Sequence, residues 1–139
     1  MKKLLSSILV LAVICSASVI TVSAASGSSD ITPYYNNIFQ YNSTFIIDDN
    51  GDAEICVSYK SDPGVVTNAT IEIRLLRKTL LFFWSEVETW TDTSTSSIYS
   101  NVHTTSLSKT GTYKVEITYT INGNGGAADV ITDEIEQKY

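Results

Sequence analysis

The sequence predicts an all-β protein in which two antiparallel sheets of about seven strands pack as a sandwich. Serine, threonine, valine, isoleucine and tyrosine are abundant after residue 40, and these residue types favour pleated, half-buried surfaces. Polar and apolar residues alternate there over short runs, and the 3.6-residue period of an amphipathic helix is missing. The runs recur at fairly regular spacing, which is typical of a sandwich and, as a second interpretation, of a small barrel.

The first 24 residues have the layout of a secretory signal peptide. Two lysines precede an apolar stretch over Ile8–Cys15, and Val22-Ser23-Ala24 offers small residues where a signal peptidase cuts. We therefore expect an N-terminal signal helix over 1–24, cleavage after Ala24, and a protein that is secreted or associated with the cell surface. An uncleaved anchor is the alternative, because residues 4–22 are nearly long enough to span a bilayer.

One domain fits the rest of the 139-residue chain, with a flexible segment over 25–40 and a sandwich over 41–139. The chain carries 15 acidic and nine basic residues, and this acidic balance argues against a nucleic-acid partner. It contains one histidine and two cysteines, which are too few ligands for most zinc, haem or iron–sulfur sites. We therefore expect neither a metal nor a cofactor.

Local patterns place the individual strands. Asn50-Gly51 between two β-rich runs predicts a two-residue type I′ hairpin, which puts Ile46 opposite Ile55 and turns Cys56 away from the core. Further strands are expected over about 67–77, 83–91, 98–103, 111–121 and 127–136, with loops over 92–97 and 122–126. The expected core residues are Ile46, Ala53, Ile55, Val57, Ile71, Ile73, Tyr113, Val115, Ile117 and Tyr119.

An immunoglobulin-like arrangement is expected, because Trp84 or Trp90 can serve as a central core tryptophan and Tyr113 stands where a tyrosine corner would lie. Four short segments also occur in one order: Thr32–Ile38, Asn50-Gly51, Trp84–Trp90 and Gly111–Val115. Together they resemble a group of small secreted β-sandwich proteins of Gram-positive bacteria. The resemblance covers nearly all of the chain after the signal and implies export and the sandwich fold, but no activity.

Residues that could carry catalysis are few. Cys56 and His103 form the single thiol–imidazole pair, and neither stands in a nucleophile motif. A serine triad would also need His103, and the G-x-S-x-G turn is missing. The acidic segment Asp48–Asp52 lacks the spacing of a calcium loop and suits a solvated turn. We therefore expect no catalytic residues and no metal site.

Trp84, Glu86, Glu88 and Trp90 are expected to share one face of a strand. Indole rings that stack on a sugar, beside carboxylates that accept its hydroxyl hydrogens, would make a carbohydrate-binding site. The alternative is that the indoles pack on the sheet and the carboxylates pair with basic residues of neighbouring strands.

The run Leu80-Leu81-Phe82-Phe83-Trp84 cannot direct all its side chains to one core if the strand alternates. Three arrangements would resolve this conflict. The run is a central strand covered on both faces, or a hairpin arm whose apolar tip meets a partner, or a segment that enters a membrane interface near Arg77 and Lys78. Its place between two well-patterned strands, which need a connection, favours the arm. The secreted proteins that the chain resembles carry polar turn residues at this place, so the apolar run is a departure from them. We expect Leu81 and Phe82 to be the most exposed large apolar residues and the principal contact surface.

These observations favour a non-enzymatic binding module that contacts another protein, or a second copy of itself, through the apolar tip. Carbohydrate binding and a membrane-active role are the alternatives.

Overall fold

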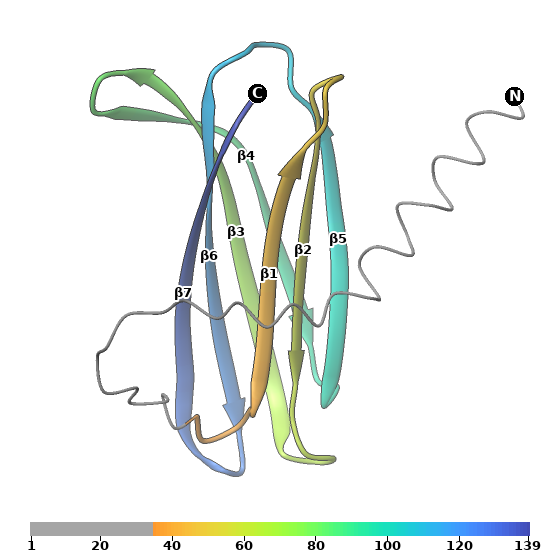
Figure 1. Ribbon diagram of the computed structural model, residues 1–139. Coiled ribbons are helices and arrows are strands. Elements are labelled where there is room, and N and C mark those ends of the chain that lie inside the picture. Colours follow the sequence, from red (N-terminus) through yellow and green to blue (C-terminus); the bar gives the residue numbers. More distant parts are fainter. Residues whose placement is uncertain (1–34) are drawn as a thin grey trace, which may run out of the picture. The chain divides into compact units, whose positions relative to one another are not determined.

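The computed structural model describes residues 35–139 (Figure 1). The predicted signal peptide and most of the predicted N-terminal segment lie outside the described residues. Strands account for most of the described chain, and no helix occurs in it. The strands are β1 (Gln40–Ile47), β2 (Asp52–Lys60), β3 (Val66–Leu80), β4 (Phe83–Ser94), β5 (Ile98–Ser106), β6 (Thr112–Gly123) and β7 (Gly126–Lys138).

The strands form two antiparallel sheets, which confirms the predicted all-β, two-sheet architecture. One sheet has the order β1-β2-β5 and the other the order β4-β3-β6-β7. β4 and β5 follow each other in the chain, yet each is an edge strand of a different sheet, and residues 95–97 join them (Figure 1).

The inward faces of the two sheets form one hydrophobic core. Because successive strand residues point to opposite faces, each central strand contributes every second side chain. β3 and β6 contribute the longest runs, and the predicted faces of both strands are confirmed. The completely buried side chains of these two strands are Ala69, Ile71, Ile73, Leu75, Val115, Tyr119 and Ile121.

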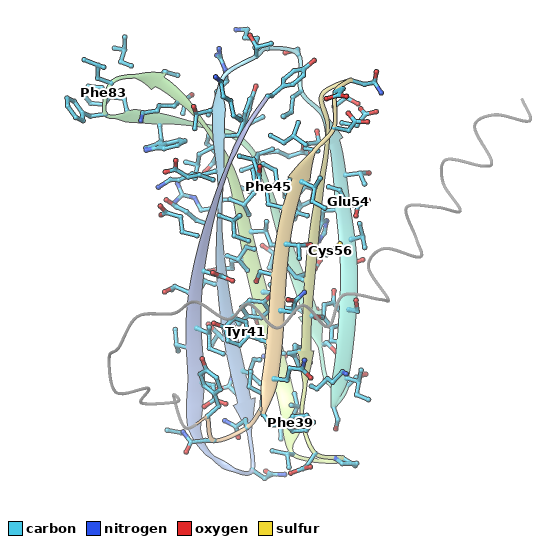
Figure 2. All side chains as sticks on the ribbon, in the orientation of Figure 1. Phe39, Tyr41, Phe45, Glu54, Cys56 and Phe83 are labelled. Atoms are coloured by element: carbon cyan, nitrogen blue, oxygen red, sulfur yellow. The ribbon has the colours of Figure 1, made fainter. Side chains whose placement is uncertain are left out.

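The register of the β1–β2 hairpin differs from the predicted one. Phe45 lies opposite Ile55, because the connection is a type I turn closed by Gly51 and not a two-residue type I′ turn. The Gly51 N–H donates to the carbonyl of Asp48, and Gly51 alone in this turn has a positive φ, at 84°. A shift of one residue exchanges the two faces of a strand. Phe45 is therefore 2% exposed and Ile46 49% exposed, so Ile46 is not a core residue (Figure 2 labels Phe45).

Two predicted loops are shorter than the sequence suggested. β4 continues to Ser94, so Asp92 lies in a strand and pairs with Ile71 of β3. Pairing with a central strand overrides the weak strand preference of this polar run. The connection between β6 and β7 is reduced to Asn124-Gly125.

Tyr113 fixes the crossing from β5 to β6. Its ring is 2% exposed, and its hydroxyl donates to the carbonyl of Lys109, four residues upstream, at 2.6 Å. This is the contact expected of a tyrosine corner. Gly111 also exchanges two backbone hydrogen bonds with Tyr139, which holds the start of β6 against the end of β7.

A buried carboxylate holds the chain where it enters the sandwich. Asp129 of β7 accepts hydrogen bonds from the backbone N–H groups of Asn36, Asn37 and Ile38 at 2.7, 2.7 and 3.2 Å. A Cβ at Gly125 would lie 1.8 Å from the carbonyl oxygen of Asn36, so only glycine fits the adjoining turn. Residues 36–38, which the sequence placed in a flexible segment, are therefore fixed to the β6–β7 end of the sandwich.

The corrected register predicts opposite effects for two adjacent residues. Phe45→Ala should lower the free energy of unfolding by about 3–5 kcal/mol, because it empties a buried site. Ile46→Ala should change it by less than about 1 kcal/mol, because that side chain is half exposed. Denaturant unfolding of both variants measures the difference. A larger loss of unfolding free energy for Ile46→Ala than for Phe45→Ala would contradict the observed register and favour the type I′ hairpin.

Candidate functional site

The β3–β4 hairpin extends beyond the sandwich as a two-stranded arm. β3 loses its second neighbour at the Arg77–Tyr113 pair, where β6 begins, but it stays paired with β4 through Lys78–Trp84 and Leu80–Phe83. Leu81 and Phe82 form the turn. We call residues 78–84 the arm. Figure 1 shows it leaning away from the two sheets.

The end of the arm is covered by exposed apolar side chains. Leu80, Leu81, Phe82 and Phe83 are 69, 81, 85 and 67% exposed. Leu81 and Phe82 are thus the most exposed large apolar residues in the described part of the chain, as predicted, and Figure 2 labels Phe83 beside them. The alternative of a central strand covered on both faces is wrong. We call these four residues the apolar cap.

Trp84 lies behind the cap in different surroundings. Its side chain is half-buried on the outer face of the β4-β3-β6-β7 sheet, under two ammonium groups. Lys114 Nζ lies 4.8 Å and Lys78 Nζ 5.6 Å from the centre of its ring, within the range of cation–π attraction. A sugar that stacked on a ring face under these ammonium groups would have to displace them.

Ion pairs organise the acidic groups around Trp84. Lys114 Nζ pairs with Glu116 and Glu134 at 2.8 and 3.0 Å, and Arg74 pairs with Glu86 and Glu116 at 3.2 and 2.9 Å. The hydrogen bond with Glu116, followed by that with Glu134, raises the pKa of Lys114. The exposed members of this network contribute little to stability.

The predicted carbohydrate residues do not share one face. Val87 is an extra residue in β4, because Glu86 pairs with Leu76 and Glu88 with Leu75. Such a bulge reverses the alternation beyond it. Two further pairs show the result: Trp84 lies opposite Lys78 on the outer face, while Trp90 lies opposite the buried Ile73 and packs against the core. Trp90, not Trp84, is therefore the core tryptophan.

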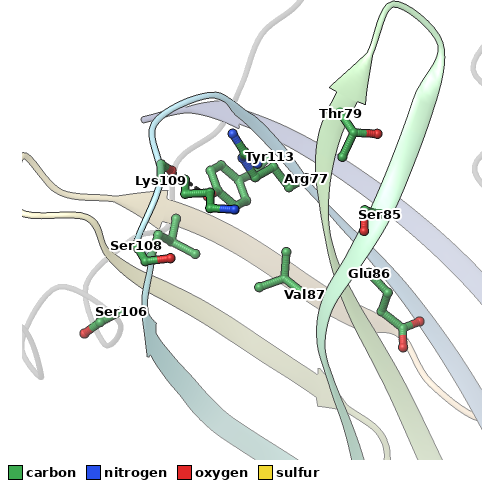
Figure 3. A pocket seen from close by; sticks show the side chains of 10 residues that line it. Arg77, Thr79, Ser85, Glu86, Val87, Ser106, Ser108, Lys109 and Tyr113 are labelled. Atoms are coloured by element: carbon green, nitrogen blue, oxygen red, sulfur yellow. Dashed lines mark hydrogen bonds between the residues drawn. The ribbon is translucent and has the colours of Figure 1, made fainter.

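A hollow of about 360 Å³ lies beside the base of the arm (Figure 3). The arm side and the β5–β6 connection each supply one wall. Within it, Arg77 Nη2 donates to the carbonyl of Thr110 at 3.2 Å, while Arg77 Nε is buried without a hydrogen-bond partner in the described part of the chain. The residues that line it include Arg77, Ser85, Val87, Ser108, Lys109 and Tyr113.

Sequence reasoning missed a polar cluster between the two edge strands. His103 Nε2 of β5 lies 2.8 Å from Asp92 Oδ2 of β4, and Asn101 Nδ2 donates to the same oxygen at 3.2 Å. The Asp92 and His103 side chains are 10 and 13% exposed, and the ring of Trp90 lies 5.2 Å from that of His103. The sequence predicted a short strand ending at His103 and a loop beginning at Asp92, so it gave no reason to bring the two side chains together.

The cluster does not form a nucleophilic site with Cys56. His103 lies opposite Ile55 in the β2–β5 ladder and shares its inward face, so Cys56 points to the other face of the sheet. Within residues 35–139, no serine hydroxyl or cysteine thiol hydrogen-bonds to His103. The arrangement joins the two sheets at their open edge.

Hydrogen bonding sets the charge of the cluster. Burial works against the ionised form of Asp92, but hydrogen bonds from His103, Asn101 and Tyr99 outweigh it and lower the pKa of the carboxyl group. Burial, together with the same carboxylate, raises the pKa of Tyr99 to about 12. Asp92 is therefore the charged acceptor and Tyr99 a neutral donor near neutral pH.

The acidic hairpin tip has a structural explanation. Asp48 Oδ1 accepts hydrogen bonds from the backbone N–H groups of Asn50 and Asp52, both at 2.9 Å. The bond from Asp52 is the largest cause of the lowered pKa of Asp48. Its carboxylate caps the turn, and no cluster of metal-ligating side chains occurs among the described residues.

No protein-family model, curated protein or solved structure matches the chain. In the described part of the chain, no helix is long and apolar enough to cross a membrane.

Asp92→Asn tests the cluster. Because the folded-state pKa is lowered, the carboxylate stabilises the fold above its unfolded pKa of about 3.9, and this contribution is lost as the pH falls through the folded value. At pH 7 the variant should be about 1–3 kcal/mol less stable than the parent protein, and the gap should narrow below about pH 4. Urea unfolding from pH 2 to 7 measures it.

Glu72→Gln is the control for that titration, since Glu72 is an exposed carboxylate on the outer face of β3. It should change stability by less than about 0.5 kcal/mol at each pH. A gap for Asp92→Asn that stayed constant down to pH 2 would show that its charge does not hold the sheets together.

Proposed function

We propose that this protein is a non-enzymatic binding module whose contact surface is the apolar cap of the arm. The observation that carries the proposal is the exposure of four consecutive large apolar residues, Leu80–Phe83, at the end of an arm that the core does not need. Apolar patches on monomeric proteins are costly in water and mark interaction sites when they are contiguous.

The position of the cap supports binding in preference to packing. The core is complete without it, because the buried residues of β3 end at Leu76 and those of β6 begin at Tyr113. The arm holds the cap away from the sheets on two paired strands, and Thr79 Oγ1 donates to the carbonyl of Phe83 at 3.3 Å near the turn. A partner can therefore surround the cap without disturbing the sandwich.

We also propose an immunoglobulin-like sandwich that is exported and is secreted or attached to the cell surface. The division of the strands into sheets of three and four and the tyrosine corner at Tyr113 support the fold assignment. The fourth strand departs from the constant-type immunoglobulin pattern, because β4 pairs with β3 and not with the sheet of β1 and β2. The layout of residues 1–24 supports export.

Replacing the two most exposed residues of the cap tests the contact surface. Leu81→Ser combined with Phe82→Ser should leave the unfolding free energy within about 0.5 kcal/mol of the parent value, as for other surface changes. The same variant should lose retention on a hydrophobic surface and any concentration-dependent self-association in sedimentation experiments. Cooperative unfolding at a clearly lower denaturant concentration would place these side chains in the core and end the proposal.

Export has its own test. The protein recovered from the medium of a secreting host should begin at Ala25 when its N-terminus is sequenced, because cleavage follows the small residue Ala24. Recovery of the protein only in the membrane fraction, with Met1 retained, would identify an uncleaved anchor instead.

A further inference from the structure

We propose that the partner of the apolar cap is the interface of a phospholipid membrane that contains anionic headgroups. This inference rests on the proposed function, because it names the partner of the same surface. Shape, depth and charge each point to a lipid surface in preference to a protein groove.

The cap covers one side of the arm and its end with apolar side chains. Leu80 and Phe83 form a cross-strand pair on one side of the ribbon, Leu81 and Phe82 occupy its end, and Trp84 lies on the opposite side with Lys78. All four cap residues are at least two-thirds exposed. A rigid protein groove buries one side of a ribbon and leaves the other in water. The acyl boundary of a bilayer is fluid and contacts every side of an inserted tip.

The depth of the cap matches that of an interfacial anchor. The Lys78–Trp84 pair lies two to three residues behind the turn, so at about 3.3 Å per residue the cap is about 7–10 Å deep. Amphipathic segments at membrane interfaces bury their apolar side to a similar depth of about 5–10 Å. Deeper insertion is disfavoured, because both edges of the arm carry unpaired backbone groups beyond β6.

Trp84 and Lys78 then lie at the level of the headgroups. Tryptophan concentrates at this level in membrane proteins, because its ring is apolar and its N–H is polar. A lysine can place its aliphatic stem along the apolar layer and its ammonium group among the phosphates. The observed stacking of Lys78 over Trp84 presents both groups at the same level of the arm.

The charge around the arm favours anionic headgroups. Residues 77–84 contain two basic residues and no acidic one, in a chain with 15 acidic and nine basic residues. Arg77 and Lys109 face the hollow directly behind the arm, and Ser85 and Ser108 add hydroxyl groups (Figure 3). Of the neighbouring acidic groups, Glu86 also borders the hollow and is paired with Arg74. The acidic Asp48–Asp52 turn lies at the same end of the sandwich, and the arm leans away from it (Figure 1).

Vesicle flotation tests the inference directly. The protein is residues 25–139, which retain the whole compact unit from Tyr34 to Tyr139. Vesicles of phosphatidylcholine, alone or with about one third phosphatidylserine, are used at about 1 mM lipid, because a single short apolar anchor binds with about 10⁴ M⁻¹. The parent protein should float with the mixed vesicles, and Leu81→Ser with Phe82→Ser should bind at least about tenfold more weakly.

A matched variant controls for general loss of apolar surface. Ile98→Ser combined with Val130→Ser removes two side chains that are 68 and 64% exposed on other strands. It should float as the parent protein does. Equal losses for both double variants would mean that adsorption is non-specific and would overturn the inference.

The charge of the arm is tested separately. Lys78→Gln should weaken binding to the mixed vesicles about fivefold, since each basic residue near an anionic surface contributes about that factor. It should leave binding to phosphatidylcholine unchanged. Lys60→Gln is the control, because Lys60 is exposed at the far end of β2. An equal effect of the two variants would contradict headgroup contact at the arm.

Fluorescence of Trp84 reports the depth of insertion. Trp90→Phe removes the core tryptophan and leaves Trp84 as the single indole. Its emission should shift to shorter wavelength on mixed vesicles, and lipids brominated near the headgroup end of the acyl chain should quench it. An unchanged spectrum with bound vesicles would place the contact elsewhere on the protein.

The outcomes separate the two proposals. The parent protein could bind neither kind of vesicle while the Leu81 and Phe82 changes still abolish self-association. In that case the cap contacts protein, and the lipid inference alone is wrong. If those changes affect neither vesicle binding nor association, the cap is not a contact surface and both proposals fail.

Discussion

The unequal lengths of β3 and β6 produce the arm. β6 begins at the corner held by Tyr113, and upstream of that corner the chain turns toward β5. β3 continues past this point with β4 as its only neighbour. Residues 78–84 therefore extend past the end of the β3–β6 pairing, and the cap side chains have no opposing sheet to pack on.

Two less covered places in the sandwich are each stabilised by a carboxylate. At the end where the chain enters, the Asp129 carboxylate satisfies three consecutive backbone N–H groups. At the open edge, Asp92 and His103 connect strands of different sheets through a nearly buried polar contact. Apolar packing stabilises the centre of the sandwich, where each sheet covers the other. Hydrogen bonds to carboxylates stabilise the less covered entry end and edge. Such bonds are strong only when every buried group has a partner.

The alternation of polar and apolar residues made most of the fold predictable. Extra residues, in the β1–β2 turn and in β4, changed the strand faces that alternation alone predicted. The inward faces of β3 and β6 followed from their period of two. The inward face of β1 could not be predicted in this way, because Ile46 and Ile47 give the strand apolar residues on both faces. Gly51 is also compatible with more than one type of turn. The extra residue Val87 separated Trp84 from Trp90 without any mark in the sequence. The arm was predictable because a long apolar run stood where a connection was required, whereas the Asp92–His103 contact depends on how two sheets meet.

The location of the Asp129 contacts has a mechanical consequence. Asp129 lies opposite Ile121, and Arg77 lies opposite Tyr113, so the entry of the chain and the base of the arm are at opposite ends of β6, about 25 Å apart along that strand. A pull between the entry segment and a surface held at the arm would run parallel to the strands. It would load many backbone hydrogen bonds of β3, β6 and β7 together in shear, and would not open them one after another.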